Sequence, residues 1–159
     1  MKNLYIIGNG FDLHHNLNTS YFNFREYLHK IKETDILEIL ERNFDKENLW
    51  SNFEESLGEI DINKYVEENF YDLEYSQNHS KYIGSRFVNK LKNYLCQWMF
   101  SINTNTELEK INHLPLNIES TFLTFNYTDT LETVYKISEE RIIYLHGKCK
   151  NTKKKIKII

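Results

Sequence analysis

Three short runs rich in β-branched and aromatic residues constrain the fold more than any other feature of the chain. They occupy residues 4–7, 121–125 and 141–145, and each has the length of a buried strand. Between the last two runs, Leu131, Val134 and Tyr135 fall at helical spacing, so this part of the chain predicts a βαβ unit. The pattern favours an α/β fold with a parallel sheet.

A long helical stretch separates the first run from the second. Thr19 or Ser20 can cap a first helix, Asp35 and Glu38 have the spacing of a capping box, and Pro115, the only proline, marks the end of the stretch. We therefore predict one domain with a core at 1–18 and 116–147, a helical insertion at 19–115 and a lysine-rich tail at 148–159. The apolar stripes that predict helices are Tyr21, Phe24, Leu28 and Ile31; Trp50, Phe53, Leu57 and Ile60; and Phe87, Leu91, Tyr94, Leu95, Trp98 and Ile102.

Composition excludes several classes of protein. With 159 residues, 40% hydrophobic content and a net charge of -3, the chain has the material for one globular core and no global attraction to nucleic acid. The lysine-rich tail is the one basic segment of the sequence. Its six lysines at 148–157 fit either a nucleic-acid- or phosphate-binding segment or a frayed end. Cys96 and Cys149 match neither a disulfide framework nor a zinc site, and no apolar run is long enough to span a membrane, so we expect a cytoplasmic protein.

Three motifs follow the predicted strands, where α/β sheets build their binding sites. They are GNGFD at 8–12, TFNYTDTLE at 124–132 and LHG at 145–147. Gly8 and Gly10 lack a Cβ, so a phosphate or ribose can approach the backbone, and they permit positive φ angles. A dinucleotide-binding motif would have a third glycine at position 13, where this sequence has Leu13. The two glycines Gly8 and Gly10 therefore also fit an ordinary turn at the end of a strand.

Polar residues of the other two motifs are candidates for catalysis. Asn126 directly follows the second strand, where an amide is well placed to orient a substrate. Asp129 fits either a catalytic role or the N-cap of the next helix, and capping is favoured. His146 ends the third strand beside Gly147, which is a usual position for a general base.

Other ionisable residues have simpler explanations. Glu54 fits a solvated helix surface, with a position over the glycine motif as the alternative. His29 and Glu33 have an i, i+4 spacing that can bind a metal, but no third ligand is near in sequence, so no metal site is predicted.

The motifs together resemble the AbiH family of bacteriophage abortive-infection proteins. The resemblance rests on IIGNGFDL with His15, Thr19, Ser20 and Tyr21, on WSNFEESL at 50–57, on FLTFNYTDTLE and on YLHG, in register from the first strand to Gly147. Asn16 and Asn18 stand where the family pattern has glycine and proline. Because family members usually continue past the HG segment, the chain is expected to be a shortened member.

The same motifs are also similar, more distantly, to the sirtuin arrangement, which implies a Rossmann-like sheet. In that comparison Asn126 matches the asparagine that orients the nicotinamide end of NAD, His146 matches the base, and Asp129 loosely matches the acid. The set of four zinc cysteines is missing, so protein deacetylation is not implied. The nucleotide site that the resemblance implies comprises Gly8, Asn9, Gly10, Phe11, Asp12, His15, Thr124 and Asn126.

Two functions follow as hypotheses. The first is an anti-phage protein that binds NAD or a related nucleotide and hydrolyses it, without a metal, through Asn126, His146 and Asp129. The alternative is a nucleotide-binding or sensing module without turnover, which acts through a partner. Expected partners are the nucleotide, a phage-derived trigger and further copies of the chain. A nuclease is disfavoured because paired carboxylates at metal-ligand spacing are missing.

Overall fold

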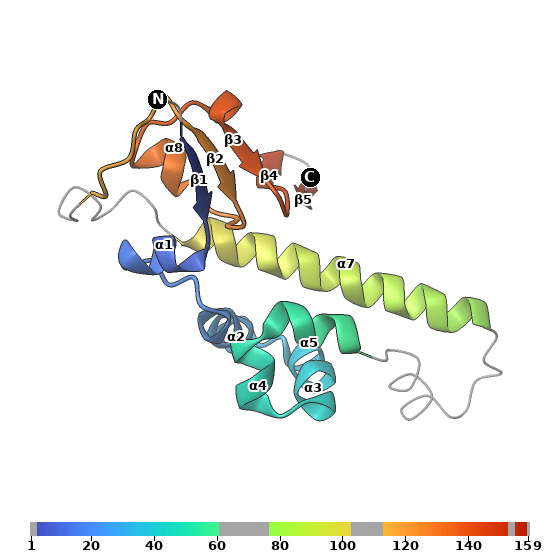
Figure 1. Ribbon diagram of the computed structural model, residues 1–159. Coiled ribbons are helices and arrows are strands. Elements are labelled where there is room, and N and C mark those ends of the chain that lie inside the picture. The colour runs from blue at the N-terminus through green and yellow to red at the C-terminus, as the bar shows by residue number, and fades with distance from the viewer. Residues whose placement is uncertain (1–2, 61–76, 103–112, 153–154, 159) are drawn as a thin grey trace. The chain divides into compact units, whose positions relative to one another are not determined.

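The structure is a computed structural model in which residues 3–60, 77–102, 113–152 and 155–158 are described (Figure 1). The chain divides into two compact units. The sheet unit comprises Met1–Ser20 with Cys96–Ile159, and the helical unit comprises Tyr21–Leu95. The helical unit lies within the stretch for which the sequence predicts helices.

A three-stranded parallel sheet forms the centre of the sheet unit and confirms the predicted α/β class. Its strands are β1 (Leu4–Ile7), β2 (Thr121–Thr124) and β3 (Ile142–Tyr144), in the order β1-β2-β3. The short helix α8 (Thr130–Thr133) and the 3-10 turn η2 (Glu139–Arg141) connect β2 to β3. The predicted helix in this connection is real but is only four residues long.

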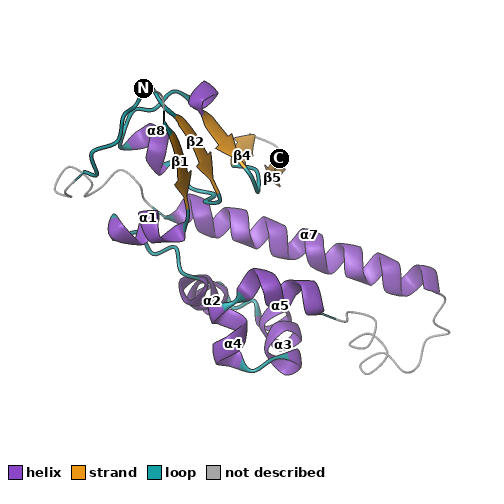
Figure 2. Cartoon of the chain, viewed as in Figure 1, coloured by secondary structure: helices purple, strands orange, loops and turns teal. Residues whose placement is uncertain are grey.

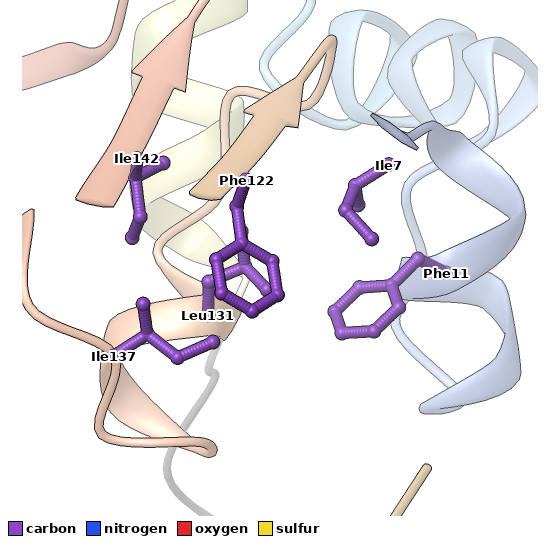
Figure 3. Close-up of a cluster of buried hydrophobic side chains, with 6 residues drawn as sticks. All are labelled: Ile7, Phe11, Phe122, Leu131, Ile137 and Ile142. Carbon is purple, nitrogen blue, oxygen red and sulfur yellow. The ribbon is translucent and has the colours of Figure 1, made fainter. Parts of the chain in front are cut away.

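One face of the sheet carries the hydrophobic core (Figure 3). Successive strand residues point to opposite faces, so Ile7, Phe122 and Ile142 lie on the same face. Helix α1 (Asn9–His14) contributes Phe11 to this core, and Leu131 and Ile137 come from α8 and the segment after it. On the opposite face Leu4, Ile6 and Ile143 are each more than half exposed.

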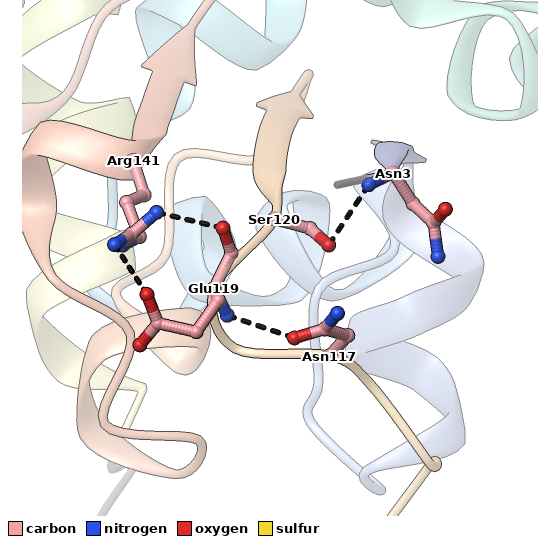
Figure 4. A network of polar contacts seen from close by, with 5 residues as sticks. All are labelled: Asn3, Asn117, Glu119, Ser120 and Arg141. Atoms are coloured by element: carbon pink, nitrogen blue, oxygen red, sulfur yellow. Dashed lines mark hydrogen bonds and ion pairs between the residues drawn. The ribbon is translucent and has the colours of Figure 1, made fainter. Parts of the chain in front are cut away.

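A polar network fixes the strands at the amino end of the sheet (Figure 4). The Asn3 amide donates to Ser120 Oγ at 3.1 Å, next to the first residue of β2. Arg141 donates to the carbonyl of Glu119 at 2.7 Å and to its carboxylate at 2.6 Å, and the Glu119 amide donates to Asn117 Oδ1 at 3.1 Å. The entry to β2 is thereby tied to both neighbouring strands.

The helical unit departs from the predicted helices in two places. Helix α3 begins at Thr34, so Asp35 lies in its first turn and the predicted capping box is wrong. The series from Trp50 to Ile60 is split at Asn52, which ends one helix and precedes the next. The helices are α2 (Tyr21–Lys30), α3 (Thr34–Asn43), α4 (Lys46–Ser51), α5 (Phe53–Glu59) and most of α7 (Gln77–Ser101).

A largely buried carboxylate joins three elements of the helical unit. Glu41 accepts from Arg25 at 2.6 Å, from Lys46 at 2.8 Å and from the Trp50 indole at 3.3 Å. Burial alone would raise the pKa of Glu41, but the hydrogen bonds from Arg25 and Lys46 outweigh it and lower the pKa to about 2. The group is therefore ionised at neutral pH and holds α2, α3 and α4 together.

Two features near the ends of the sheet unit were not predicted. Strands β4 (Cys149–Thr152) and β5 (Lys155–Ile158) pair in antiparallel fashion, where the sequence predicted a tail (Figure 2). Cys96, fully buried in α7, is disulfide-bonded, although the cysteine spacing predicted no disulfide framework.

None of the helices in the described ranges combines the length and apolarity that a membrane crossing requires.

The core position of Phe122 gives a first prediction. Its side chain has no exposed surface and lies on the central strand, so Phe122→Ala should lower the free energy of unfolding by about 3–5 kcal/mol. The exposed Ile118, in the loop before β2, is the control, and Ile118→Ala should change it by less than about 0.5 kcal/mol. Urea denaturation measures both values, and equal losses would contradict the assignment of the core.

Candidate functional site

The three predicted motifs meet at the carboxyl edge of the sheet. Ile7 is in register with Thr124, and Thr124 is in register with Tyr144. Each of the candidate residues Asn9, Asn126 and His146 therefore lies two positions beyond one of these aligned residues. Because all three strands are parallel, the residues follow strands that end at the same edge, as the sequence predicted (Figure 2).

The glycine motif forms the end of β1 and the beginning of α1. Gly8 occupies the N-cap of α1 with an extended backbone, and neither Gly8 nor Gly10 has a positive φ, so the conformational reason predicted for them is wrong. A Cβ added to either glycine would meet no described atom within 4 Å. Neither backbone conformation nor internal packing therefore requires glycine at these positions. Asn9 is held beside them, because its Oδ1 accepts from Thr19 Oγ1 at 2.6 Å.

Asp12 is buried and anchors α1 to the segment after β2. The side chain is 1% exposed, and its carboxylate accepts from Thr128 Oγ1 at 2.7 Å and from Thr130 Oγ1 at 2.9 Å. Burial raises the pKa of Asp12, and the two hydroxyl hydrogen bonds oppose this shift. Asp12 therefore acts as a structural link within the site, and its predicted contact with a nucleotide stays a prediction.

His15 is equally buried, and both of its ring nitrogens are hydrogen-bonded. Nδ1 lies 2.6 Å from the Phe11 carbonyl oxygen, which can only accept, so Nδ1 carries the proton. In the neutral ring Nε2 then accepts from the Tyr135 hydroxyl at 2.8 Å, and the hydroxyl oxygen accepts from the Leu114 amide at 3.0 Å. His15 thus connects α1 to residues near the amino end of β2 and beyond α8.

Asn126 connects the ends of β1 and β2. Its side-chain Nδ2 donates to the Gly8 carbonyl at 3.1 Å, and its main-chain amide donates to Thr124 Oγ1 at 3.0 Å. Asn126 and Thr124 are both buried. Asp129 occupies the N-cap position of α8, as the favoured explanation of this acid predicted, although its side chain makes no capping hydrogen bond.

His146 lies in a turn beyond β3, half-buried between aromatic rings. Its ring centroid is 5.5 Å from that of Phe125 and 6.0 Å from that of Tyr127. The turn is closed by the Gly147 amide, which donates to the Tyr144 carbonyl at 3.3 Å. Gly147 has φ 80°, a conformation that side chains with a Cβ rarely adopt, so glycine is required here.

Glu132, which the sequence did not single out, holds both sides of this turn. Its Oε1 accepts from the Tyr144 hydroxyl at 2.5 Å and from Lys148 Nζ at 2.6 Å. Burial, together with the negative charge of Glu132, raises the pKa of Tyr144 far above its usual value. We call the contacts among Glu132, Tyr144 and Lys148 the Glu132 clasp, and it fixes the residues on either side of His146.

The remaining predicted candidates belong to the helical unit, and the alternative position of Glu54 over the glycine motif stays a prediction. Glu54 accepts a hydrogen bond from the Tyr21 hydroxyl at 2.6 Å within the helical unit. Glu33 pairs with Lys90 at 2.8 Å. In the part of the chain that the structure describes, no three His, Cys, Asp or Glu side chains are grouped so that they could hold a metal ion.

Fold and site together define an α/β protein with a polar edge at the carboxyl ends of three parallel strands. A family model described as bacteriophage abortive infection AbiH matches residues 4–158. The chain therefore belongs to the AbiH family. No curated protein and no solved structure gives a significant match to the chain.

The buried Asp12 gives a prediction about pH. Because burial raises its pKa in the folded chain, the folded state retains a proton that the unfolded state releases at about pH 4. The free energy of unfolding should therefore contain a component that falls as pH rises from about 4 to the folded pKa, and Asp12→Asn should remove it. Urea denaturation across this range measures the component. Asp35→Asn, at an exposed carboxylate, should retain it, and an identical pH profile for Asp12→Asn and the wild type would contradict the prediction.

The Glu132 clasp gives a prediction about coupling. Glu132→Gln and Tyr144→Phe should each lower the free energy of unfolding by about 1–3 kcal/mol. The double variant should lose less than the sum, because the first removes the charge of the acceptor and the second the donor of the same hydrogen bond. As control, Glu119→Gln breaks a more exposed pair with Arg141 and should cost less than about 1 kcal/mol. Strictly additive losses in a double-mutant cycle would show that the clasp does not act as a unit.

Proposed function

We propose that the chain acts in abortive infection by binding NAD or a related nucleotide at the carboxyl edge of its sheet, and that His146 is the base for hydrolysis of this nucleotide. The observation that carries the proposal is the open space at Gly8 and Gly10. Two glycines that neither the backbone nor the packing requires are well suited to let a ribose or phosphate approach the chain. Family membership supports the role in abortive infection.

The order of groups along the edge supports a sirtuin-like, Rossmann-like arrangement. A glycine motif follows β1, Asn126 follows β2, and the His146-Gly147 pair follows β3. Parallel strands at the centre of the unit and a site at their carboxyl ends agree with such a sheet. Asp129, at the N-cap of α8 but without a side-chain capping hydrogen bond, lies on the same connection and is the candidate acid.

The proposed hydrolysis needs one base and no metal. The bond between the nicotinamide nitrogen and ribose C1′ breaks, and nicotinamide leaves with the bonding electrons. A water oxygen attacks the cationic C1′, and its proton passes to the His146 ring to give ADP-ribose. The hydrogen bond from the Asn126 side chain to the Gly8 carbonyl holds the ends of β1 and β2 together, where the ribose is proposed to bind.

A second candidate function is nucleotide binding without turnover. It is favoured by the hydrogen bonds that already engage two of the predicted ligand-binding groups. The Asn126 amide donates to the Gly8 carbonyl, and both oxygens of Asp12 accept from threonines. In this alternative the edge senses a nucleotide and passes the signal to a partner. A phage-derived trigger and assembly into oligomers stay predictions under both functions.

Release of nicotinamide from NAD by the purified chain tests the enzymatic proposal. His146→Ala should lower the rate by about 10²- to 10⁴-fold, the usual contribution of a positioned base, and Asn126→Ala should also lower it. His29→Ala, at an exposed histidine on α2, is the matched control and should leave the rate unchanged. Equal release by the wild type and His146→Ala would show that His146 is not the base.

Thermal unfolding with NAD and with ADP-ribose separates the two functions. A nucleotide at about 100 times its Kd should stabilise the chain by about 2.7 kcal/mol whether or not it is cleaved. Stabilisation without nicotinamide release supports the sensing module. The absence of any stabilisation would contradict both functions.

A further inference from the structure

Three aromatic side chains gather at the carboxyl edge of the sheet beside the glycine motif. Phe125 and Tyr127 come from the segment after β2, and His146 comes from the turn after β3. The Phe125 and His146 rings meet nearly at right angles, and the Tyr127 and His146 rings are inclined at 45°. We call these three side chains the ring cluster.

The ring cluster is not part of the hydrophobic core. Phe125 is 39% exposed, whereas the core rings Phe11 and Phe122 are buried on the opposite face. The alternation of the strands explains the difference, because Phe125 follows Thr124 and therefore points to the face that carries Ile6 and Leu123. The exposed part of the Phe125 ring therefore leaves an aromatic face on which a planar group can pack.

Open space adjoins the exposed ring. Phe125 continues the register beyond the pair Ile7 and Thr124, and its amide donates to the Ile7 carbonyl at 2.9 Å, so Gly8, the residue after β1, is its neighbour. A Cβ at Gly8 would meet no described atom within 4 Å. The absence of a side chain at Gly8 thus keeps the backbone next to Phe125 clear. A flat group placed beside the Phe125 ring would therefore meet no side chain at position 8.

We propose that the ring cluster binds the nicotinamide ring of an oxidised nicotinamide nucleotide. This inference rests on the proposed nucleotide site and adds the residues that recognise the base. A planar heteroaromatic ring stacks on aromatic side chains, and the positive charge of oxidised nicotinamide adds an attraction to their π faces. The cluster includes His146, so nicotinamide in this position brings the bond to C1′ close to the proposed base.

This assignment predicts discrimination between redox states. The reduced nicotinamide ring carries no positive charge, so only its stacking remains. The cluster should therefore bind the oxidised nucleotide more tightly than NADH. The ring cluster should also contribute nothing to the binding of ADP-ribose, which lacks the nicotinamide ring.

Calorimetric titration tests the inference with three probes: carba-NAD, in which a methylene replaces the ribose ring oxygen and prevents cleavage, NADH and ADP-ribose. Phe125→Leu should weaken the binding of carba-NAD by about 5- to 100-fold, which is the range of one base stack. It should weaken the binding of NADH by a smaller factor and leave the binding of ADP-ribose unchanged. Phe125→Tyr, which keeps the ring, should retain the wild-type affinity. Phe22→Leu, at a 46% exposed ring on α2, is the matched control and should change none of the three.

The possible outcomes separate this inference from the proposed function. If Phe125→Leu binds carba-NAD as tightly as the wild type does, the ring cluster does not bind nicotinamide, although the nucleotide site stands. If Phe125→Leu weakens ADP-ribose as much as carba-NAD, the cluster takes adenine and the inference is wrong. A wild-type chain that binds none of the three probes overturns both proposals. Circular-dichroism melting of each variant confirms that it is folded, as expected for changes at exposed rings.

Discussion

The geometry of the candidate site depends on one buried carboxylate. Asp12 lies on α1, immediately after the glycine motif, and its two oxygens accept from threonines that follow β2, more than a hundred residues later in the chain. Burying an ionised group is costly unless its oxygens are hydrogen-bonded, so the two threonine hydroxyls are what makes this position tolerable. The link holds α1 against the segment after β2, and with it the Gly8 carbonyl stays within reach of the Asn126 amide.

Polar contacts at the amino edge of the sheet fix the register of β2. The network of Asn3, Ser120, Glu119 and Arg141 fixes where β2 enters between its neighbours. In a strand, a slip of one residue exchanges the two faces, so this entry decides whether Phe122 or Leu123 is buried. It also decides which residues emerge at the carboxyl edge. Polar contacts at one edge therefore determine the identity of the candidate site at the other.

Local patterns in the sequence were enough to predict the three strands of the parallel sheet and the common edge of the three motifs. These predictions rest on short apolar runs, such as residues 4–7, which can be recognised without knowing a tertiary partner. The partners of Asp12 could not be predicted in this way, because Thr128 and Thr130 are distant in sequence and resemble ordinary cap residues. Glu132 was missed for the same reason, since an acid in a short helix usually faces solvent. The break at Asn52 was missed because the apolar spacing continues across it.

Binding and hydrolysis make different demands on the same edge. Binding needs clearance over the backbone and a face on which a base can stack, and these depend on Gly8 and the exposed Phe125 ring. Hydrolysis also needs a ring nitrogen of His146 held in a fixed direction toward the reacting carbon. Gly147 and the Glu132 clasp fix the turn on both sides of His146, which is more rigidity than a stacking surface requires. The Glu132 clasp therefore supports the proposed hydrolysis, whereas the hydrogen bonds that already engage Asn126 and Asp12 favour binding without turnover.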